Sequence, residues 1–166
     1  MNIRSMTSKD KSALGSILQH TPEFTPAEVV LADEVISDYL FNPTESGYFI
    51  LVAEIDSSIR GYICYGPTPI TEGTWDIYWL AVDPGTQGQG IGRKLMQAAE
   101  EKIHKARGRL ILVETSSEPG YEKTNLFYQR VGYKEAGRII DFYAIGDDQV
   151  IYEKRFTESL PLLKRG

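Results

Sequence analysis

A glycine-rich turn between a strand and a helix carries the clearest chemical signal in this sequence. Residues 75–82 are apolar enough for a strand, and the turn at 87–92 reads Gln-Gly-Gln-Gly-Ile-Gly before a helical pattern begins. The first N–H groups of a helix lack intrahelical partners, and the helix dipole adds positive potential at that end. Glycines let the backbone come close to a phosphate because they carry no Cβ. The stretch therefore predicts a phosphate site.

The spacing of this turn separates three classes of phosphate-binding loop. A P-loop requires Gly-x-x-x-x-Gly-Lys-Ser/Thr, but Ile91 and Gly92 stand where the lysine and the hydroxyl must be. The dinucleotide fingerprint requires Gly-x-Gly-x-x-Gly, whereas Arg93 occupies the position of its third glycine. Glu114 ends the next strand at a distance suited to a ribose hydroxyl. A dinucleotide-dependent oxidoreductase therefore stays open as the weaker alternative.

The third class fits the turn best. The pattern Gln87-x-x-Gly90-x-Gly92, after a strand that ends Leu-Ala-Val, resembles the GNAT superfamily of acyl-CoA-dependent N-acetyltransferases. The later run Asn-Leu-Phe-Tyr-Gln-Arg-Val-Gly-Tyr at 125–133 strengthens the resemblance, which covers about residues 3–156. The resemblance implies acetyl-CoA as co-substrate, and it implies these coenzyme-binding residues: Leu80, Ala81, Val82, Gln87, Gly88, Gln89, Gly90, Ile91, Gly92, Arg93, Asn125 and Tyr128.

The resemblance also assigns the groups that act on the thioester. Amide formation requires a polarised carbonyl, a neutral amine and a proton for the leaving thiolate. A main-chain N–H on the strand that ends at Val82 is implied to polarise the carbonyl. Tyr128 is implied to protonate the thiolate, and Asn125, three residues earlier on the same helix face, is implied to bond the pantetheine arm.

The base that deprotonates the amine is less clearly marked. The resemblance points to Asp76, which strand alternation places on the same face as Tyr78 and Leu80. Glu72 and Glu114 are rivals for this role, and each of the three could instead be a solvated acid at a strand end.

Composition excludes several classes of protein. The chain has 166 residues, a net charge of −5 and one cysteine, Cys64, inside an apolar strand. We therefore expect one domain, a reducing cytoplasmic compartment and no nucleic-acid partner. No secretory signal and no membrane span are expected. The two histidines, His20 and His104, are far apart and lack companions at ligand spacing, so no metal site is expected.

The elements that position these residues follow from apolar periodicity and turn residues. The expected fold is mixed α/β, with a twisted, mostly antiparallel sheet of about seven strands, about four helices and a splayed parallel strand pair. Helices are expected near 8–20, 25–41, 90–107 and 121–131, with Gly108 as the C′ glycine of the third. Strands are expected at 2–6, 48–55, 59–65, 75–82, 109–114, 133–144 and 150–156.

Residues 1–156 are expected to form a single acetyltransferase domain, followed by a C-terminal tail at 157–166. We predict acetyl transfer to a primary amine, on a small molecule or a peptide, by direct attack in a ternary complex. A domain of the same fold that binds acyl-CoA without turnover is the other alternative. The sequence does not identify the amine, and it leaves open the homodimer that is common among similar proteins.

Overall fold

A single seven-stranded sheet organises the chain. The computed structural model describes residues 1–156, so the tail predicted at 157–166 lies outside them. The strand order is β1-β2-β3-β4-β5-β7-β6, and every neighbouring pair is antiparallel except β4 and β5. The strands are β1 (Asn2–Ser5), β2 (Phe49–Ile55), β3 (Ser58–Pro67), β4 (Thr74–Val82), β5 (Leu110–Ser116), β6 (Lys134–Ala144) and β7 (Asp147–Arg155). The predicted sheet is confirmed.

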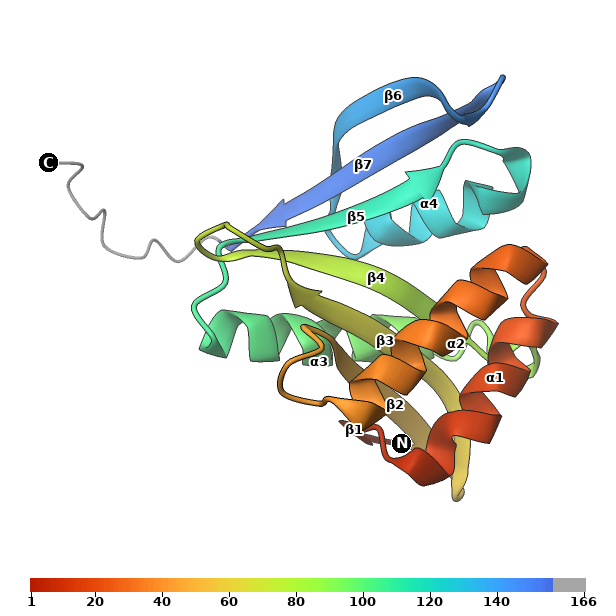
Figure 1. The fold of residues 1–166 in the computed structure, drawn as a ribbon. Coiled ribbons are helices and arrows are strands. Elements are labelled where there is room, and N and C mark those ends of the chain that lie inside the picture. Colours follow the sequence, from red (N-terminus) through yellow and green to blue (C-terminus); the bar gives the residue numbers. More distant parts are fainter. Residues whose placement is uncertain (157–166) are drawn as a thin grey trace, which may run out of the picture.

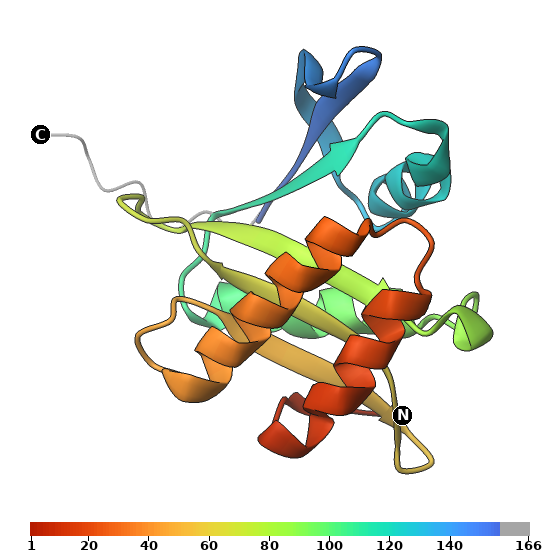
Figure 2. The same cartoon turned by 45° about the vertical axis from the view of Figure 1, so that its right-hand side comes forward.

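Four α-helices cover the two faces of this sheet. They are α1 (Lys11–His20), α2 (Pro26–Phe41), α3 (Ile91–Lys105) and α4 (Glu122–Arg130), and short 3-10 turns lie at η1 (Ser8–Asp10), η2 (Pro84–Thr86) and η3 (Pro119–Tyr121). Figures 1 and 2 show α1 and α2 side by side across one face of the β1–β4 half, with α3 on the other face. Within residues 1–156, no helix is long and apolar enough to cross a bilayer.

Each face of the sheet buries its own hydrophobic core. The core on the α3 side contains Leu95 and Ile103 of the helix, together with Trp75 and Ile77 of β4. The core on the α1 and α2 side contains Leu14 and Ile36 from the helices, with Cys64 from β3 among the strand residues. Cys64 is therefore a core residue, as expected, and burial raises the pKa of its thiol.

Local sequence signals place the ends of most elements. Thr25 and Glu28 form a capping box at the start of α2, and Pro26 takes the first helical position. The prediction that Gly108 serves as the C′ glycine of α3 is wrong, because Arg107 adopts the left-handed conformation instead, with φ of 64°. Gly108 is needed for close packing, since a Cβ there would lie 2.3 Å from the Ile103 side chain.

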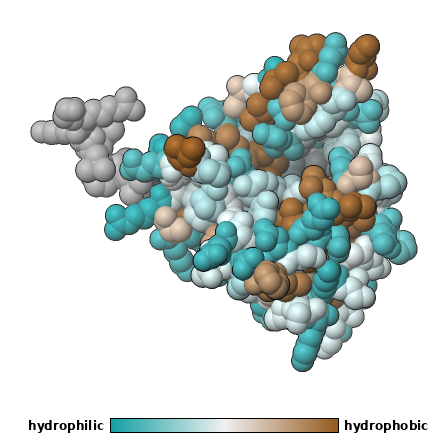
Figure 3. All heavy atoms as spheres, in the orientation of Figure 1, coloured by the Kyte–Doolittle hydropathy of each residue, from teal (hydrophilic) through white to brown (hydrophobic). Residues whose placement is uncertain are grey.

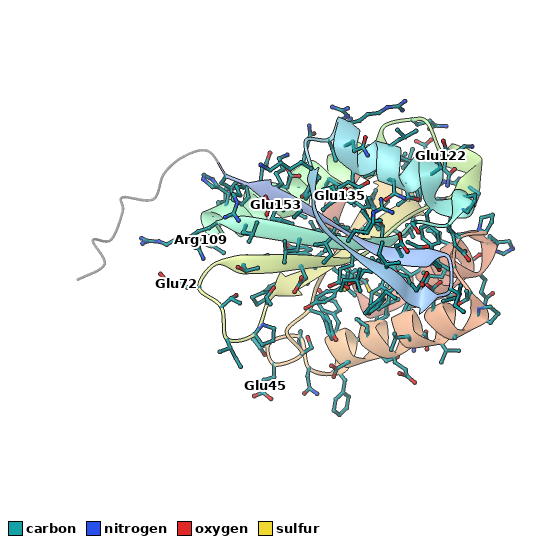
Figure 4. All side chains as sticks on the ribbon, turned by 90° about the horizontal axis from the view of Figure 1, so that it is seen from above. Glu45, Glu72, Arg109, Glu122, Glu135 and Glu153 are labelled. Atoms are coloured by element: carbon teal, nitrogen blue, oxygen red, sulfur yellow. The ribbon has the colours of Figure 1, made fainter. Side chains whose placement is uncertain are left out.

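Strands β4 and β5 are joined at one end and separate at the other. Their parallel pairing runs from Thr74↔Leu110 to Ile77↔Val113 and then stops, although both strands continue. At the joined end, Arg109 Nε donates to the Glu72 carbonyl at 2.8 Å, and Figure 4 shows these two residues together there. The predicted splayed parallel pair is therefore confirmed, and the candidate site lies at its open end.

A half-buried ion pair fastens the start of the chain to the sheet. Arg4 donates to both carboxylate oxygens of Asp10, at 2.8 and 2.9 Å, and the Thr7 N–H donates to the same carboxylate. The hydrogen bonds from Arg4 are the main cause that lowers the pKa of Asp10. We expect Asp10→Ala to cost about 2 kcal/mol at neutral pH, a value discounted because Arg4 is 32% exposed.

Urea unfolding at several pH values tests this assignment. An acid whose folded pKa is lowered stabilises the protein above the unfolded value of about 3.9, and this contribution is lost as the pH falls through the lowered folded value. The stabilities of wild type and Asp10→Ala should therefore converge as the pH falls through the lowered folded pKa of Asp10. Asp33→Ala, which removes an exposed acid 3.9 Å from Lys11, is the control and should cost less than about 0.5 kcal/mol.

Candidate active site

A β-bulge at Tyr78 marks the point where β4 leaves β5. On β3, Tyr65 pairs with Ile77 and Cys64 pairs with Trp79, so Tyr78 has no partner there. An extra residue in one strand breaks the alternation of faces. Trp75 and Ile77 accordingly lie on the α3 face before the bulge, whereas Leu80 and Val82 pack on that face after it.

The bulge corrects one prediction about Asp76. Strict alternation placed Asp76 on the same face as Leu80, but the extra residue separates them. Asp76 and Tyr78 lie on the α1 and α2 face, where the Tyr78 ring meets Tyr48 edge-on at 5.3 Å between centroids. The Asp76 carboxylate accepts a hydrogen bond of 2.5 Å from Thr68 Oγ1.

The end of β4 offers free backbone groups to the open splay. The Asp83 N–H donates to the Arg60 carbonyl on β3 at 2.8 Å. Because backbone groups alternate sides along a strand, those of Ala81 also point to β3, and those of Leu80 and Val82 point away from it. Pairing with β5 has already ended at Ile77, so this edge can accept an extended ligand as a strand would.

The N-terminus of α3 lies directly beyond this edge, and no side chain among residues 1–156 caps it. Gly90 is its N-cap residue, no side chain caps it, and its first turn contains no acid. The N–H groups of Ile91, Gly92 and Arg93 therefore remain available to an anion. Gly88 and Gly90 have φ of 83° and 78°, which requires glycine, and a Cβ on either would meet nothing within 4 Å.

Asp83 holds the entrance to this turn, a role that the sequence did not reveal. Its carboxylate accepts from the Gly85 N–H at 3.1 Å and from Arg60 at 2.9 Å. The backbone hydrogen bond from Gly85 is the larger cause of its lowered pKa, followed by Arg60. The turn thus begins at a fixed point on β3.

Asn125 ties α4 to the open end of β5. Its Nδ2 donates to the Ser116 and Tyr121 carbonyls at 3.0 and 2.9 Å, and its Oδ1 accepts from Thr115 at 2.6 Å. Both amide protons are thus used within the protein, and only the second lone pair of Oδ1 remains for a ligand. These contacts set the position of α4, and with it that of Tyr128.

Tyr128 combines a buried ring with an accessible hydroxyl. The residue is 5% exposed and its ring packs against Phe127, Tyr133 and Tyr152. Within the described residues the Tyr128 hydroxyl makes no hydrogen bond. Its oxygen is nevertheless not fully buried, unlike the unpartnered hydroxyl oxygen of Tyr62, so the Tyr128 hydroxyl reaches solvent-accessible space. Burial raises the pKa of Tyr128, so this group is protonated at neutral pH.

Asp76 on β4 and Glu114 on β5 lie close enough to repel each other, while the third candidate base lies elsewhere. Desolvation, and then repulsion from Asp76, raise the pKa of Glu114 above the ordinary carboxyl value. Gln149 Nε2 donates to Glu114 at 3.0 Å and fixes its carboxylate. Glu72 lies beside Arg109 at the joined end of the strands, outside this group.

The walls of the open end come from segments far apart in the sequence. The Tyr121 hydroxyl, in η3, donates to the Glu23 carbonyl, between α1 and α2, at 2.8 Å across 98 residues. On the opposite wall the hydroxyl of Ser116 donates to Asp147, at the start of β7. Figure 3 shows a recess between the β6, β7 and α4 part and the α1 and α2 part, with hydrophobic residues on both rims.

Two pockets lie beside other parts of the sheet and helices. One, of about 340 Å³, is lined by residues that include Phe49, Tyr65, Trp75 and Lys102, beside the last turns of α3. The other, of about 430 Å³, lies between α4 and the β6–β7 pair, and its lining includes Arg138 and the candidate site residue Asn125. Neither contains the free edge of β4 or the glycine turn, so the candidate site rests on the splay itself.

Known proteins share this arrangement. A family model described as the acetyltransferase (GNAT) domain matches residues 46–135, which is more than half of the chain. A structure from Desulfovibrio desulfuricans, assigned to the GNAT family of acetyltransferases, is 36% identical with a TM-score of 0.90. The match covers 93% of this chain and 98% of that one.

More distant structures share the fold. The ribosomal-protein-S18-alanine N-acetyltransferase of Escherichia coli is 19% identical, with a TM-score of 0.76 over 98% of this chain and 97% of that one. An aminoglycoside 6'-N-acetyltransferase in complex with coenzyme A is 18% identical, with a TM-score of 0.73 over 93% and 97%.

One curated protein is similar over a shorter stretch. The S-(2-succino)cysteine N-acetyltransferase of Bacillus subtilis is 34% identical over 73 residues. These residues are 44% of this chain and 44% of that protein, so the similarity spans less than half of either.

Proposed function

Because the chain belongs to the GNAT acetyltransferase family, we propose that it transfers an acetyl group from acetyl-CoA to a primary amine by direct attack in a ternary complex. One observation carries the proposal. The free edge of β4 leads to the uncapped N-terminus of α3, and α4, which holds the accessible Tyr128 hydroxyl, is fixed to the end of β5 by Asn125. An extended amide arm, a diphosphate and a thioester match these three features in turn.

The backbone supplies the binding in this proposal. The amides of residues 87–92 and the positive end of the α3 dipole hold the diphosphate, with Arg93 nearby. The pantetheine arm pairs with the Leu80 and Val82 backbone as an added strand, and Asn125 accepts a hydrogen bond from it through Oδ1. A main-chain N–H of the same edge polarises the thioester carbonyl.

The side chains move the protons. Asp76 takes a proton from the ammonium, directly or through a water, so that the neutral nitrogen attacks the carbonyl carbon. The carbon–sulfur bond then breaks, and the Tyr128 hydroxyl gives its proton to the departing thiolate. The second proton lost by the nitrogen as the amide forms restores the Tyr128 hydroxyl, and Asp76 releases its proton to solvent. The products are an N-acetylated amine and coenzyme A. Cys64 is buried in the core and takes no part, so no covalent acyl-enzyme is formed.

A thiol-release assay with acetyl-CoA and a panel of primary amines tests this function. Amine-dependent release of coenzyme A is expected, together with a rise in melting temperature on adding acetyl-CoA. If acetyl-CoA binds but no amine releases the thiol, the chain is an acyl-CoA-binding module. Absence of both binding and release at millimolar acetyl-CoA would contradict the proposal altogether.

The carboxylates of Asp76 and Glu114 can be separated by their pH dependence. A general base must be ionised, so the rate rises with pH through its pKa. We expect Asp76→Asn to lower kcat/KM about a hundredfold and to abolish this acid limb. Glu114→Gln serves as the matched control and should retain the limb. An unchanged pH–rate profile in Asp76→Asn would remove Asp76 as the base.

A further inference from the structure

The pocket beside the last turns of α3 lies at the opposite end of that helix from the glycine turn. Its volume is about 340 Å³, which falls within the range of small-ligand sites. Lys102 lines it, about 14 Å further along the helix axis than Arg93. Among the described residues, none of those assigned to coenzyme binding lines this pocket. A ligand held there would leave the splay free, and its chemistry follows from the walls.

Three aromatic rings form one wall of this pocket. Phe49 of β2 stacks on Tyr65 of β3, with 5.5 Å between centroids and an interplanar angle of 22°. The ring of Trp75 on β4 lies 5.8 Å from that of Phe49 and 6.1 Å from that of Tyr65. Tyr65 and Trp75 are buried, whereas Phe49 is 45% exposed. The wall thus offers a flat apolar surface on which a further aromatic ring can stack.

The Tyr65 hydroxyl opens into the pocket without a partner. The residue is only 2% exposed, and its hydroxyl makes no hydrogen bond within residues 1–156. Its oxygen is nevertheless not among the fully buried polar atoms that lack a partner, so it reaches accessible space. Because Tyr65 lines the pocket, that space is the pocket itself. A polar group that is buried to this degree gains free energy when a ligand supplies its missing partner.

Two further donors border the same space, and no carboxylate lines it. Desolvation, and then the interaction with Tyr39 of α2, raise the pKa of Tyr65, so this hydroxyl is protonated at neutral pH and lies near that of Tyr39. The Tyr39 hydroxyl also makes no hydrogen bond among the described residues. Lys102 forms no ion pair in the part of the chain that the structure describes. An ammonium and two hydroxyls suit an anionic acceptor group.

We propose that this pocket is a second ligand site, which binds a small aromatic carboxylate. The ring of the ligand stacks on Phe49 and Trp75, and its carboxylate accepts hydrogen bonds from the Tyr65 hydroxyl and the Lys102 ammonium. Trp75 directly precedes Asp76 on β4, so the pocket adjoins the proposed base although it lies outside the splay. The inference does not depend on acetyl transfer.

Calorimetric titration of the whole chain with 2-naphthoate and two matched compounds provides the first test. We expect 2-naphthoate to bind with a Kd on the order of 0.1 mM, which suits a ligand of this size. The uncharged 2-naphthamide should bind about fivefold more weakly because it loses charge-assisted hydrogen bonds. The saturated decahydro-2-naphthoate should also bind about fivefold more weakly because it cannot stack. No binding of 2-naphthoate at millimolar concentration, or equal affinity for all three compounds, would overturn the inference.

Two variants and two controls assign the donors. Tyr65→Phe keeps the ring stacked on Phe49 and removes only the unpartnered hydroxyl, so it should weaken 2-naphthoate binding about tenfold. Lys102→Gln removes an exposed charge and should weaken binding about threefold. Tyr62→Phe removes a sealed, unpartnered hydroxyl outside the pocket, and Lys105→Gln removes a charge from the same helix end. Both controls should bind as the wild type does, and losses as large as those in the variants would overturn the assignment.

The indole N–H signals of the two tryptophans locate the bound probe by NMR. Trp75 lines the pocket, whereas Trp79 packs against the core on the α1 and α2 side. We expect 2-naphthoate to shift the Trp75 signal and to leave that of Trp79 in place. Coenzyme A at millimolar concentration should change the affinity for 2-naphthoate by less than about twofold, because uncoupled sites bind independently. Displacement by coenzyme A, or shifts confined to the amides of residues 87–92, would place the probe in the splay and overturn the inference.

Discussion

Replacing Tyr128 by phenylalanine should lower kcat about a hundred- to a thousandfold, while acetyl-CoA binding stays within about threefold of wild type. The ring remains in its cluster with Phe127, Tyr133 and Tyr152, so packing is kept. Only the hydroxyl that we propose as the proton donor to the leaving thiolate is lost. Because this hydroxyl has no hydrogen-bond partner within the described residues, its removal leaves no protein group unsatisfied.

Tyr133 provides a matched control within the same aromatic cluster. It is also buried, but its hydroxyl donates to Glu100 at 3.0 Å. Tyr133→Phe should therefore reduce the free energy of unfolding by about 1 kcal/mol and leave kcat unchanged. Steady-state kinetics and urea unfolding on both variants give opposite outcomes for the two tyrosines. Equal kcat values for wild type and Tyr128→Phe would show that thiolate protonation comes from another group.

The second large effect is expected from an acid placed in the first turn of α3. Arg93→Glu should weaken coenzyme A binding about a hundredfold, which corresponds to ~2.7 kcal/mol. The new carboxylate repels the diphosphate and competes for the free amides at the uncapped helix start. The same carboxylate interacts favourably with the helix dipole, so the free energy of unfolding should rise by about 0.3–1 kcal/mol. Binding and stability thus move in opposite directions.

Lys102→Glu makes the same change of charge near the other end of this helix. The site lies about 14 Å further along the axis, which exceeds the screening length of about 8 Å at physiological salt. Coenzyme A affinity should therefore be unaffected, and the acid in the last turn should lower stability through the dipole. Calorimetry and thermal melts on both variants check this. An affinity that falls equally in both would mean that net charge, and not the α3 N-terminus, governs binding.

Most of the fold could be predicted because its signals are local. The apolar stripe of α3, the capping box at Thr25 and Glu28 and the turn residues at element ends depend on neighbours within a few positions. The glycine turn could be assigned for the same reason, since positive φ at Gly88 and Gly90 is a property of those residues. Gly108 shows where such reasoning fails, because its lack of a side chain serves contact with Ile103.

The sequence by itself determined the order of elements, the glycine-rich turn before α3 and the placement of Asn125 and Tyr128 on one helix. Only the tertiary structure decided which groups share the site. The bulge at Tyr78 is an extra residue on β4 relative to β3, so it depends on the partner strand. It places Asp76 and Leu80 on opposite faces of the sheet, where alternation along β4 alone predicted one face. The two sides of the recess meet across contacts such as the hydrogen bond from Tyr121 to the Glu23 carbonyl, 98 residues apart. Such proximity depends on how strands and helices pack, and no local pattern encodes it.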